Sequence, residues 1–138
     1  IGLGVSSISS FDRVYAQNTT ELEAYYSALD ENHLAISKGV VLRDEDILRR
    51  EIIQNILCQR RLDIAALEKK YAIVFVKHFA QVLPLLLDMQ VDNLLLLSDN
   101  ELLVTRKGHA FMRNICMLFD EYVVGHLQSQ TVRYSRTL

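Results

Sequence analysis

The chain has 138 residues, of which 50% are apolar and 23% charged, with one proline and no tryptophan. This composition excludes a disordered chain, which combines low hydrophobicity with high net charge, and also collagen-like or low-complexity sequences. The formal net charge of −2 gives no indication of nucleic acid or an anionic membrane as partner. The length predicts one domain, and the start at Ile1 instead of Met suggests a processed protein or a piece of a longer one.

The cysteine content and the apolar runs indicate the compartment. Cys58 and Cys116 are too few for a disulfide-scaffolded secreted domain, and both lie in apolar stretches, so we expect buried thiols. No apolar run approaches the roughly 18 residues that span a bilayer. Residues 1–11 lack the basic region of a signal peptide. We therefore expect a soluble cytoplasmic protein.

The first half of the chain predicts one irregular segment and two helices. Residues 1–18 are rich in Gly and Ser and predict a strand end followed by an irregular loop. Thr20 and Glu23 have the spacing of a capping box, which predicts a helix over 21–30. A second helix is expected over 44–59, because its apolar residues form one stripe: Ile47, Leu48, Ile52, Ile56 and Leu57.

The second half predicts further helices and one hairpin. Asp63 can cap a short helix to about residue 70, and a helix over 73–89 should kink or break at Pro84. Two apolar runs flanking a polar turn predict a β-hairpin over 94–104, and Thr105 can cap a last long helix over 106–127. The fold class is therefore mainly α with a small β-hairpin. The element order is winged-helix-like, an analogy that says little about function.

The residues alone give no catalytic or metal site. Gly2-x-Gly4 lacks the third glycine of a dinucleotide fingerprint, since Ser7 stands there, so a tight backbone path is favoured. No histidine pairs with another His or Cys at helical spacing, and no Cys-x-x-Cys occurs. Arg49 and Arg50 alternate with acidic residues, which intrahelical ion pairs explain.

Nucleic-acid binding is disfavoured by the charges of the winged-helix candidate. The expected recognition helix over 73–89 carries Lys77 as its basic residue, and the hairpin tip contains Asp99 and Glu101. A DNA-binding winged helix needs basic residues at both places. No pair of carboxylates is placed so as to imply acid–base catalysis.

Three segments carry a resemblance to a known family. They are residues 1–10 with Tyr-Ala-Gln-Asn at 15–18, residues 49–63 (Arg-Arg-Glu-Ile-Ile, Leu-Cys, Arg-Leu-Asp), and Arg-Asn-Ile-Cys-Met-Leu-Phe-Asp at 113–120. In this order they resemble the C-terminal part of the bacterial oxygen-independent coproporphyrinogen III oxidases, radical S-adenosylmethionine (SAM) enzymes of haem synthesis. The last segment favours the oxidases over the related haem chaperones.

The resemblance implies a division of the chain and a reaction. Residues 1–18 would be the tail end of the radical SAM barrel, and 19–138 a helical C-terminal domain with the hairpin near 94–104. The family converts coproporphyrinogen III to protoporphyrinogen IX with a four-iron four-sulfur cluster and SAM, and the cofactor carries the hard chemistry. The cluster motif Cys-x-x-x-Cys-x-x-Cys is absent here. We therefore expect the fragment alone to be inactive and to bind neither cofactor.

The resemblance also implies site residues and partners. The backbone of Ile8 matches a contact to a second SAM, and Tyr15, Gln17 and Asn18 would face the substrate cavity. Arg113 would pair with a substrate propionate or brace the domain interface, and bracing is favoured. The expected partners are coproporphyrinogen III and the chain's own N-terminal radical SAM domain, with no nucleic acid and no membrane.

Two alternatives stay open, and one departure from the family is tolerable. The alternatives are a stand-alone winged-helix interaction or DNA-binding module, and the C-terminal domain of a related haem chaperone. Asn93 stands where the family tends to have glycine at the entry to the hairpin. Because Asn tolerates a positive φ, the turn should survive.

Overall fold

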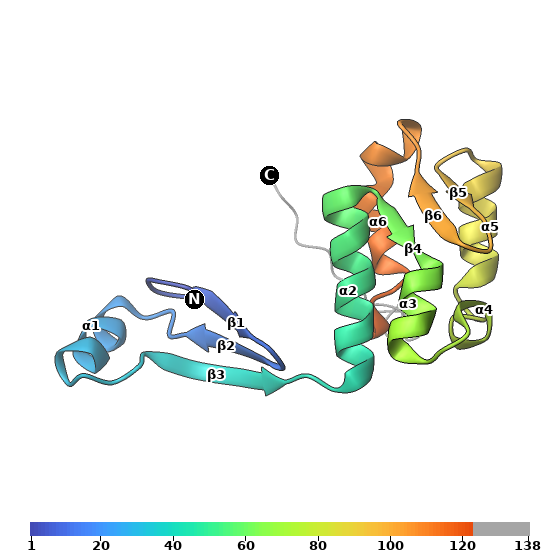
Figure 1. The fold of residues 1–138 in the computed structure, drawn as a ribbon. Helices are drawn as coiled ribbons and strands as arrows, with labels where there is room; N and C mark the ends of the chain where they lie inside the picture. The colour runs from blue at the N-terminus through green and yellow to red at the C-terminus, as the bar shows by residue number, and fades with distance from the viewer. Residues whose placement is uncertain (123–138) are drawn as a thin grey trace. The chain divides into compact units, whose positions relative to one another are not determined.

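The computed structural model describes residues 1–122 and divides into two compact units between Ile47 and Leu48. Helices predominate and are accompanied by two small three-stranded antiparallel sheets, one in each unit (Figure 1). The expected fold of mainly helix with a small β component is confirmed, but the chain contains more strand than one hairpin. The boundary between units follows residue 47, whereas the resemblance placed a boundary after residue 18.

The first unit is a three-stranded sheet with one helix. Its strands are β1 (Ile8–Phe11), β2 (Val14–Asn18) and β3 (Ile36–Val41), in the order β1-β2-β3. The irregular loop predicted within 1–18 is therefore wrong over β2, which pairs with both neighbours. The physical reason is alternation: Ala16 is buried, while Tyr15 and Gln17 project to the other face.

Helix α1 (Leu22–Asp30) was predicted within one residue, but its capping was not. Its N-cap is Glu21, which makes no side-chain cap bond, and the Glu21 N–H donates to Thr19 Oγ1 at 3.2 Å. The capping box at Thr20 is thus wrong. No residue of α1 is buried, and Leu22, Tyr26 and Leu29 remain exposed.

The next helices begin where the local sequence predicts, and the boundary between the units falls within the first of them. Helix α2 (Asp44–Gln59) has the predicted bounds, and Leu48, Ile52 and Ile56 are its buried residues. After the short strand β4 (Arg61–Asp63), helix α3 (Ile64–Tyr71) is capped as predicted, because Asp63 Oδ1 accepts from the Ala66 N–H at 2.9 Å.

The helix predicted over 73–89 is two helices, α4 (Phe75–His78) and α5 (Leu83–Val91). The break expected near Pro84 is confirmed, and the proline lies in the first turn of α5, where its missing N–H is tolerated.

The predicted hairpin is confirmed as β5 (Leu95–Leu97) and β6 (Glu101–Val104). Asn93 lies at the entry to the hairpin and has a φ of +59°, the positive value that was expected where the family tends to have glycine. Strand β4 completes the sheet in the order β4-β6-β5. It was missed because it has three residues and pairs with a strand far away in the sequence, Leu62 opposite Leu102.

The long helix predicted over 106–127 is wrong at both ends of the part that the structure describes, because only residues 112–117 form one continuous α-helix and residues 118–120 are not helical. A 3₁₀ helix η1 (Lys107–Phe111) precedes the short helix α6 (Met112–Met117). Thr105 does cap, since its Oγ1 accepts from the Gly108 N–H at 3.0 Å. Gly108 passes so close to Leu94 that a Cβ there would lie 1.9 Å from the Leu94 carbonyl oxygen. The rest of that predicted helix beyond residue 122, and the tail from 128, lie outside the described residues.

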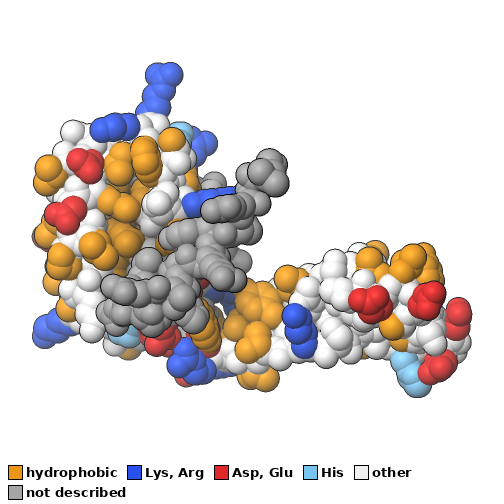
Figure 2. All heavy atoms as spheres, turned by 180° about the vertical axis from the view of Figure 1, so that it is seen from behind, with side chains coloured by type: hydrophobic (Ala, Val, Ile, Leu, Met, Phe, Trp, Pro, Cys, Tyr) orange, Lys and Arg blue, Asp and Glu red, His pale blue; other side chains and the backbone are white. Residues whose placement is uncertain are grey.

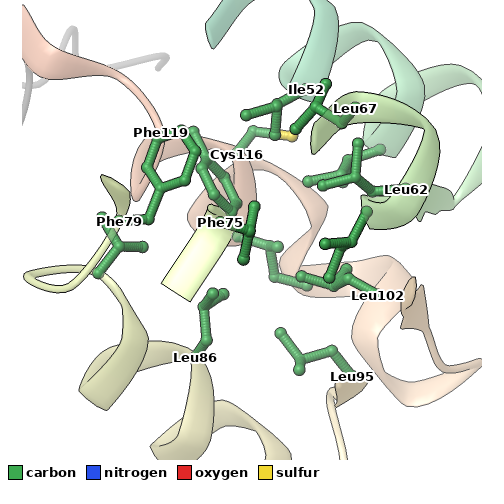
Figure 3. Packing of buried hydrophobic residues seen from close by; sticks show 14 of the residues in the cluster. Ile52, Leu62, Leu67, Phe75, Phe79, Leu86, Leu95, Leu102, Cys116 and Phe119 are labelled. Atoms are coloured by element: carbon green, nitrogen blue, oxygen red, sulfur yellow. The ribbon is translucent and has the colours of Figure 1, made fainter. Parts of the chain in front are cut away.

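The core of the second unit is built around three phenylalanines (Figure 3). The ring of Phe79 lies 5.0 Å from that of Phe75 and 5.5 Å from that of Phe119. Arg49 on α2 reaches this cluster, with its guanidinium 5.3 Å from the Phe79 ring and Nη1 donating to the Phe119 carbonyl at 3.1 Å. Around them pack further buried residues from the α-helices and the three strands of the unit, among them Ile52, Leu62, Leu86, Leu95, Leu102 and Ile115.

Candidate ligand-binding face of the first unit

One face of the β1-β2-β3 sheet brings together most of the site residues predicted from the sequence. The strand register places Ile8 opposite Gln17 and Gln17 opposite Lys38, with Tyr15 opposite Val40 in the next row. Because side chains of directly paired residues lie on the same face, these side chains surround one area. A hollow of about 200 Å³ lies there, and its lining consists of Ile8, Tyr15, Ala16, Gln17, Lys38, Gly39 and Val40.

The backbone of Ile8 lies at the free edge of this sheet. The Asn18 N–H donates to the Ser7 carbonyl at 3.0 Å. Ser7 and Asn18 are therefore a hydrogen-bonded pair. In an antiparallel ladder hydrogen-bonded and non-hydrogen-bonded pairs alternate, so the next pair, Ile8 and Gln17, is not hydrogen-bonded. The N–H and C=O of Ile8 therefore point away from β2. Gly2 passes close to this carbonyl, where a Cβ would lie 2.8 Å from the oxygen, as the predicted tight backbone path requires.

The two amide side chains predicted for the cavity have a further role in the structure. Gln17 Nε2 donates to the Ser6 carbonyl at 3.1 Å, and Asn18 Nδ2 donates to the Gly4 carbonyl at 2.9 Å and to Ser7 Oγ at 3.1 Å. These bonds hold the loop before β1. Gln17 also lines the hollow, whereas Asn18 is not among its lining residues.

Arg113 is not brought to this face by the first unit. It lies on α6 in the second unit, where its side chain is exposed. Within residues 1–122 no carboxylate pairs with it.

The cysteines do not suit an iron–sulfur cluster. Cys58 is exposed, which corrects the prediction of two buried thiols, because it lies on the outer side of α2 next to the exposed Leu57. Cys116 is buried as predicted, and burial raises the pKa of its thiol to about 11. Cluster ligands are thiolates, and among the described residues no three metal-ligating side chains gather. Residues 1–122 therefore do not fit the cluster.

A second hollow, of about 310 Å³, lies in the second unit beside α2 and α3. Its charged groups already have partners: Glu51 accepts from Lys70 Nζ at 2.6 Å and from Tyr71 Oη, Arg61 pairs with Glu101, and Asp63 accepts from the Ala66 N–H. Partial burial alone would raise the pKa of Glu51, but the hydrogen bonds from Lys70 and Tyr71 outweigh it and lower the pKa. This arrangement is a stabilising network.

Lys38 is the lining residue that sequence reasoning missed. It lies on β3, which was not predicted, so nothing placed it beside Gln17. The signal available was the strand-forming run Ile-Ser-Lys-Gly-Val-Val at 36–41, but local sequence does not reveal its pairing with β2.

The comparison with solved structures shows the class of protein that this fold resembles. The chain matches coproporphyrinogen III oxidase from Escherichia coli, described as a radical SAM enzyme, with a TM-score of 0.82 and 39% identity over 88% of this chain and 28% of that one. The chain is thus similar, in fold and sequence, to part of a radical SAM enzyme.

The curated relatives that the chain is similar to are named oxygen-independent coproporphyrinogen III oxidase. The relative from Escherichia coli is 41% identical over 123 residues, and that from Pseudomonas aeruginosa is 36% identical over 123. The Synechocystis relative is 37% identical over 134 residues, which is 94% of this chain. The chain spans 27% of the length of the first two and 29% of the third. No protein-family model matches the chain. Among residues 1–122 no helix has the length and apolar character needed to cross a membrane.

Proposed function

We propose that this chain is the C-terminal part of an oxygen-independent coproporphyrinogen III oxidase, which oxidatively decarboxylates coproporphyrinogen III to protoporphyrinogen IX. The observation that carries the proposal is the agreement of sequence and fold with such oxidases over nearly the whole chain. The cluster and the first SAM, which supply the radical chemistry, belong to a radical SAM barrel outside this chain.

Within that enzyme the two units have different roles. The second unit has its own aromatic core and covers the open end of the barrel, and Arg113 braces the interface. The first unit contributes its sheet face to the ligand cavity. Its hollow and the outward-pointing backbone of Ile8 support a contact with a second SAM.

We also propose that the second unit is of the winged-helix type. The sheet order β4-β6-β5, with α3, α4 and α5 between β4 and β5, supports this reading. In such a module α5 would be the recognition helix, yet Asp88 is its only charged residue, and Leu85, Leu87 and Val91 are exposed. An apolar recognition helix is suited to protein and not to phosphate. Figure 2 shows hydrophobic side chains at the surface, interspersed with charged ones, on the face that it presents.

The proposal is tested by assaying the complete protein that contains this chain. Under anaerobic conditions, with SAM and a reductant, it should form protoporphyrinogen IX, measured as protoporphyrin fluorescence after oxidation. The 138-residue chain alone should show no turnover and no bound iron. Stoichiometric haem binding without turnover by the complete protein, or an iron-loaded 138-residue chain, contradicts the proposal.

The contact at Ile8 has its own variant with a matched control. Because the Ile8 N–H points away from β2, Ile8→Pro removes no ladder bond, and edge strands tolerate proline at such positions. Ser10 lies two residues along the same edge, so Ser10→Pro is the control. We expect Ile8→Pro to lower turnover well below that of Ser10→Pro at equal thermal stability. Equal turnover of the two variants refutes the contact.

A further inference from the structure

Lys38 is a cation beside a mostly apolar hollow, and it has no partner among residues 1–122. It is exposed on β3, directly opposite Gln17, and none of residues 1–122 forms an ion pair or side-chain hydrogen bond with its ammonium. The two arginines of this unit are paired, Arg13 with Asp44 and Arg43 with Asp46. The missing counter-charge at the hollow is the feature that needs an explanation.

The residues that line the hollow indicate the chemical class of the ligand that would supply the negative charge. Ile8, Val40 and the ring of Tyr15 offer apolar surface, and Lys38 is the only ionisable cation among the lining residues. A single ammonium balances one negative charge, whereas a phosphate dianion usually gathers several donors or backbone N–H groups. The hollow therefore suits one carboxylate attached to an apolar or aromatic body.

We propose that Lys38 binds a ligand carboxylate in this hollow, with the body of the ligand against Ile8, Tyr15 and Val40. This inference rests on the proposed function, which offers two sources of the same chemistry: the amino-acid carboxylate of SAM and a propionate of the tetrapyrrole. Lys38 acts by binding and positioning, and takes no part in electron or proton transfer.

The test measures ligand binding by the complete protein that contains this chain, after circular dichroism has shown each variant to be folded. Lys38→Gln removes the charge, Lys38→Arg retains it, and Lys69→Gln removes an exposed lysine from α3 in the other unit. The probes are SAM, decarboxylated SAM, and coproporphyrin III as the stable tetracarboxylate, each titrated by calorimetry.

A charge-assisted hydrogen bond of this kind corresponds to roughly tenfold in affinity. We expect Lys38→Gln to lose about that factor for one carboxylate ligand, Lys38→Arg to recover most of it, and Lys69→Gln to change nothing. If SAM is the source, decarboxylated SAM binds the wild type and Lys38→Gln equally. If the tetrapyrrole is the source, the loss is confined to coproporphyrin III.

Three results overturn the inference: unchanged affinity of Lys38→Gln for both carboxylate ligands, an equal loss in Lys69→Gln, or no binding of either ligand by the wild type. Turnover of the complete protein, measured in parallel, separates this failure from that of the proposed function. If the complete wild-type protein is active and Lys38→Gln leaves the ligand affinity unchanged, only the role of Lys38 is refuted. An inactive wild type refutes the proposed function itself.

Discussion

Gly108 joins η1 to the sheet of the second unit through a contact that tolerates no side chain. A Cβ at this position would lie 1.9 Å from the Leu94 carbonyl oxygen and 2.9 Å from a methyl of Val104. The carbonyl cannot easily move, because it accepts hydrogen bonds from the Thr105 N–H at 3.0 Å and from Thr105 Oγ1 at 3.1 Å. Gly108→Ala must therefore displace η1 or break these bonds.

The expected loss follows from these contacts. Overpacking a tight site costs about 1–3 kcal/mol, and losing the bonds at a buried carbonyl costs about 1–3 kcal/mol more. We expect Gly108→Ala to reduce the free energy of unfolding of the second unit by about 3 kcal/mol, which is on the order of a hundredfold in the folding equilibrium constant.

The assay is urea unfolding followed by far-ultraviolet circular dichroism, because the chain has no tryptophan and most of its helices lie in the second unit. The control is Gly4→Ala in the first unit, where nothing lies within 4 Å of the added methyl but φ is +93°. It should leave this transition unchanged. A Gly108→Ala midpoint equal to that of the wild type would refute the packing of η1 against Leu94.

Three further predictions concern the core and the titrating groups. Phe79→Ala should reduce the free energy of unfolding by about 3–5 kcal/mol in the same urea assay, because it removes a ring that contacts both Phe75 and Phe119. A loss of less than about 1 kcal/mol would contradict this core packing. Iodoacetamide at pH 8 should alkylate the exposed Cys58 of the folded chain and spare Cys116, because burial raises the pKa of the Cys116 thiol to about 11. In urea both cysteines should be modified. Two rapid adducts on the folded chain, detected by mass spectrometry, would contradict this prediction. Because the pKa of Glu51 is lowered in the folded state, its stabilising contribution is present above its ordinary value of 4.5 and is lost as the pH falls through the folded value. The stability difference between wild type and Glu51→Gln should therefore shrink as the pH is lowered from 7 to 3, and a difference independent of pH would exclude this linkage.

Features that are determined by short stretches of sequence were predictable. The bounds of α2, the cap at Asp63, the break near Pro84 and the hairpin β5–β6 all depend on neighbouring residues. Thr105 was also recognised as a cap. Each of these features is determined by contacts within a few residues, which periodicity and capping rules describe.

Features that depend on distant partners were not predictable from one sequence. Strand β4 exists because Leu62 finds Leu102, and the long helix expected from residue 106 is interrupted because Gly108 meets Leu94. The same limit applies to the candidate site. Ile8, Tyr15 and Gln17 came from a family resemblance, but Lys38 became visible only when β3 was paired with β2. Non-local pairing decides such positions, and propensity does not.

The free edge of β1 has a practical consequence for handling this chain outside a larger protein. An exposed strand edge carries backbone groups ready to pair with another chain, and natural edges are protected by charges, prolines or covering segments. Strand β1 reads Ile-Ser-Ser-Phe, without any charge or proline, and both Ile8 and Phe11 are exposed. Preparations of the isolated chain should therefore self-associate edge to edge as their concentration rises. Ser10→Lys would place a charge on this edge and should reduce the association.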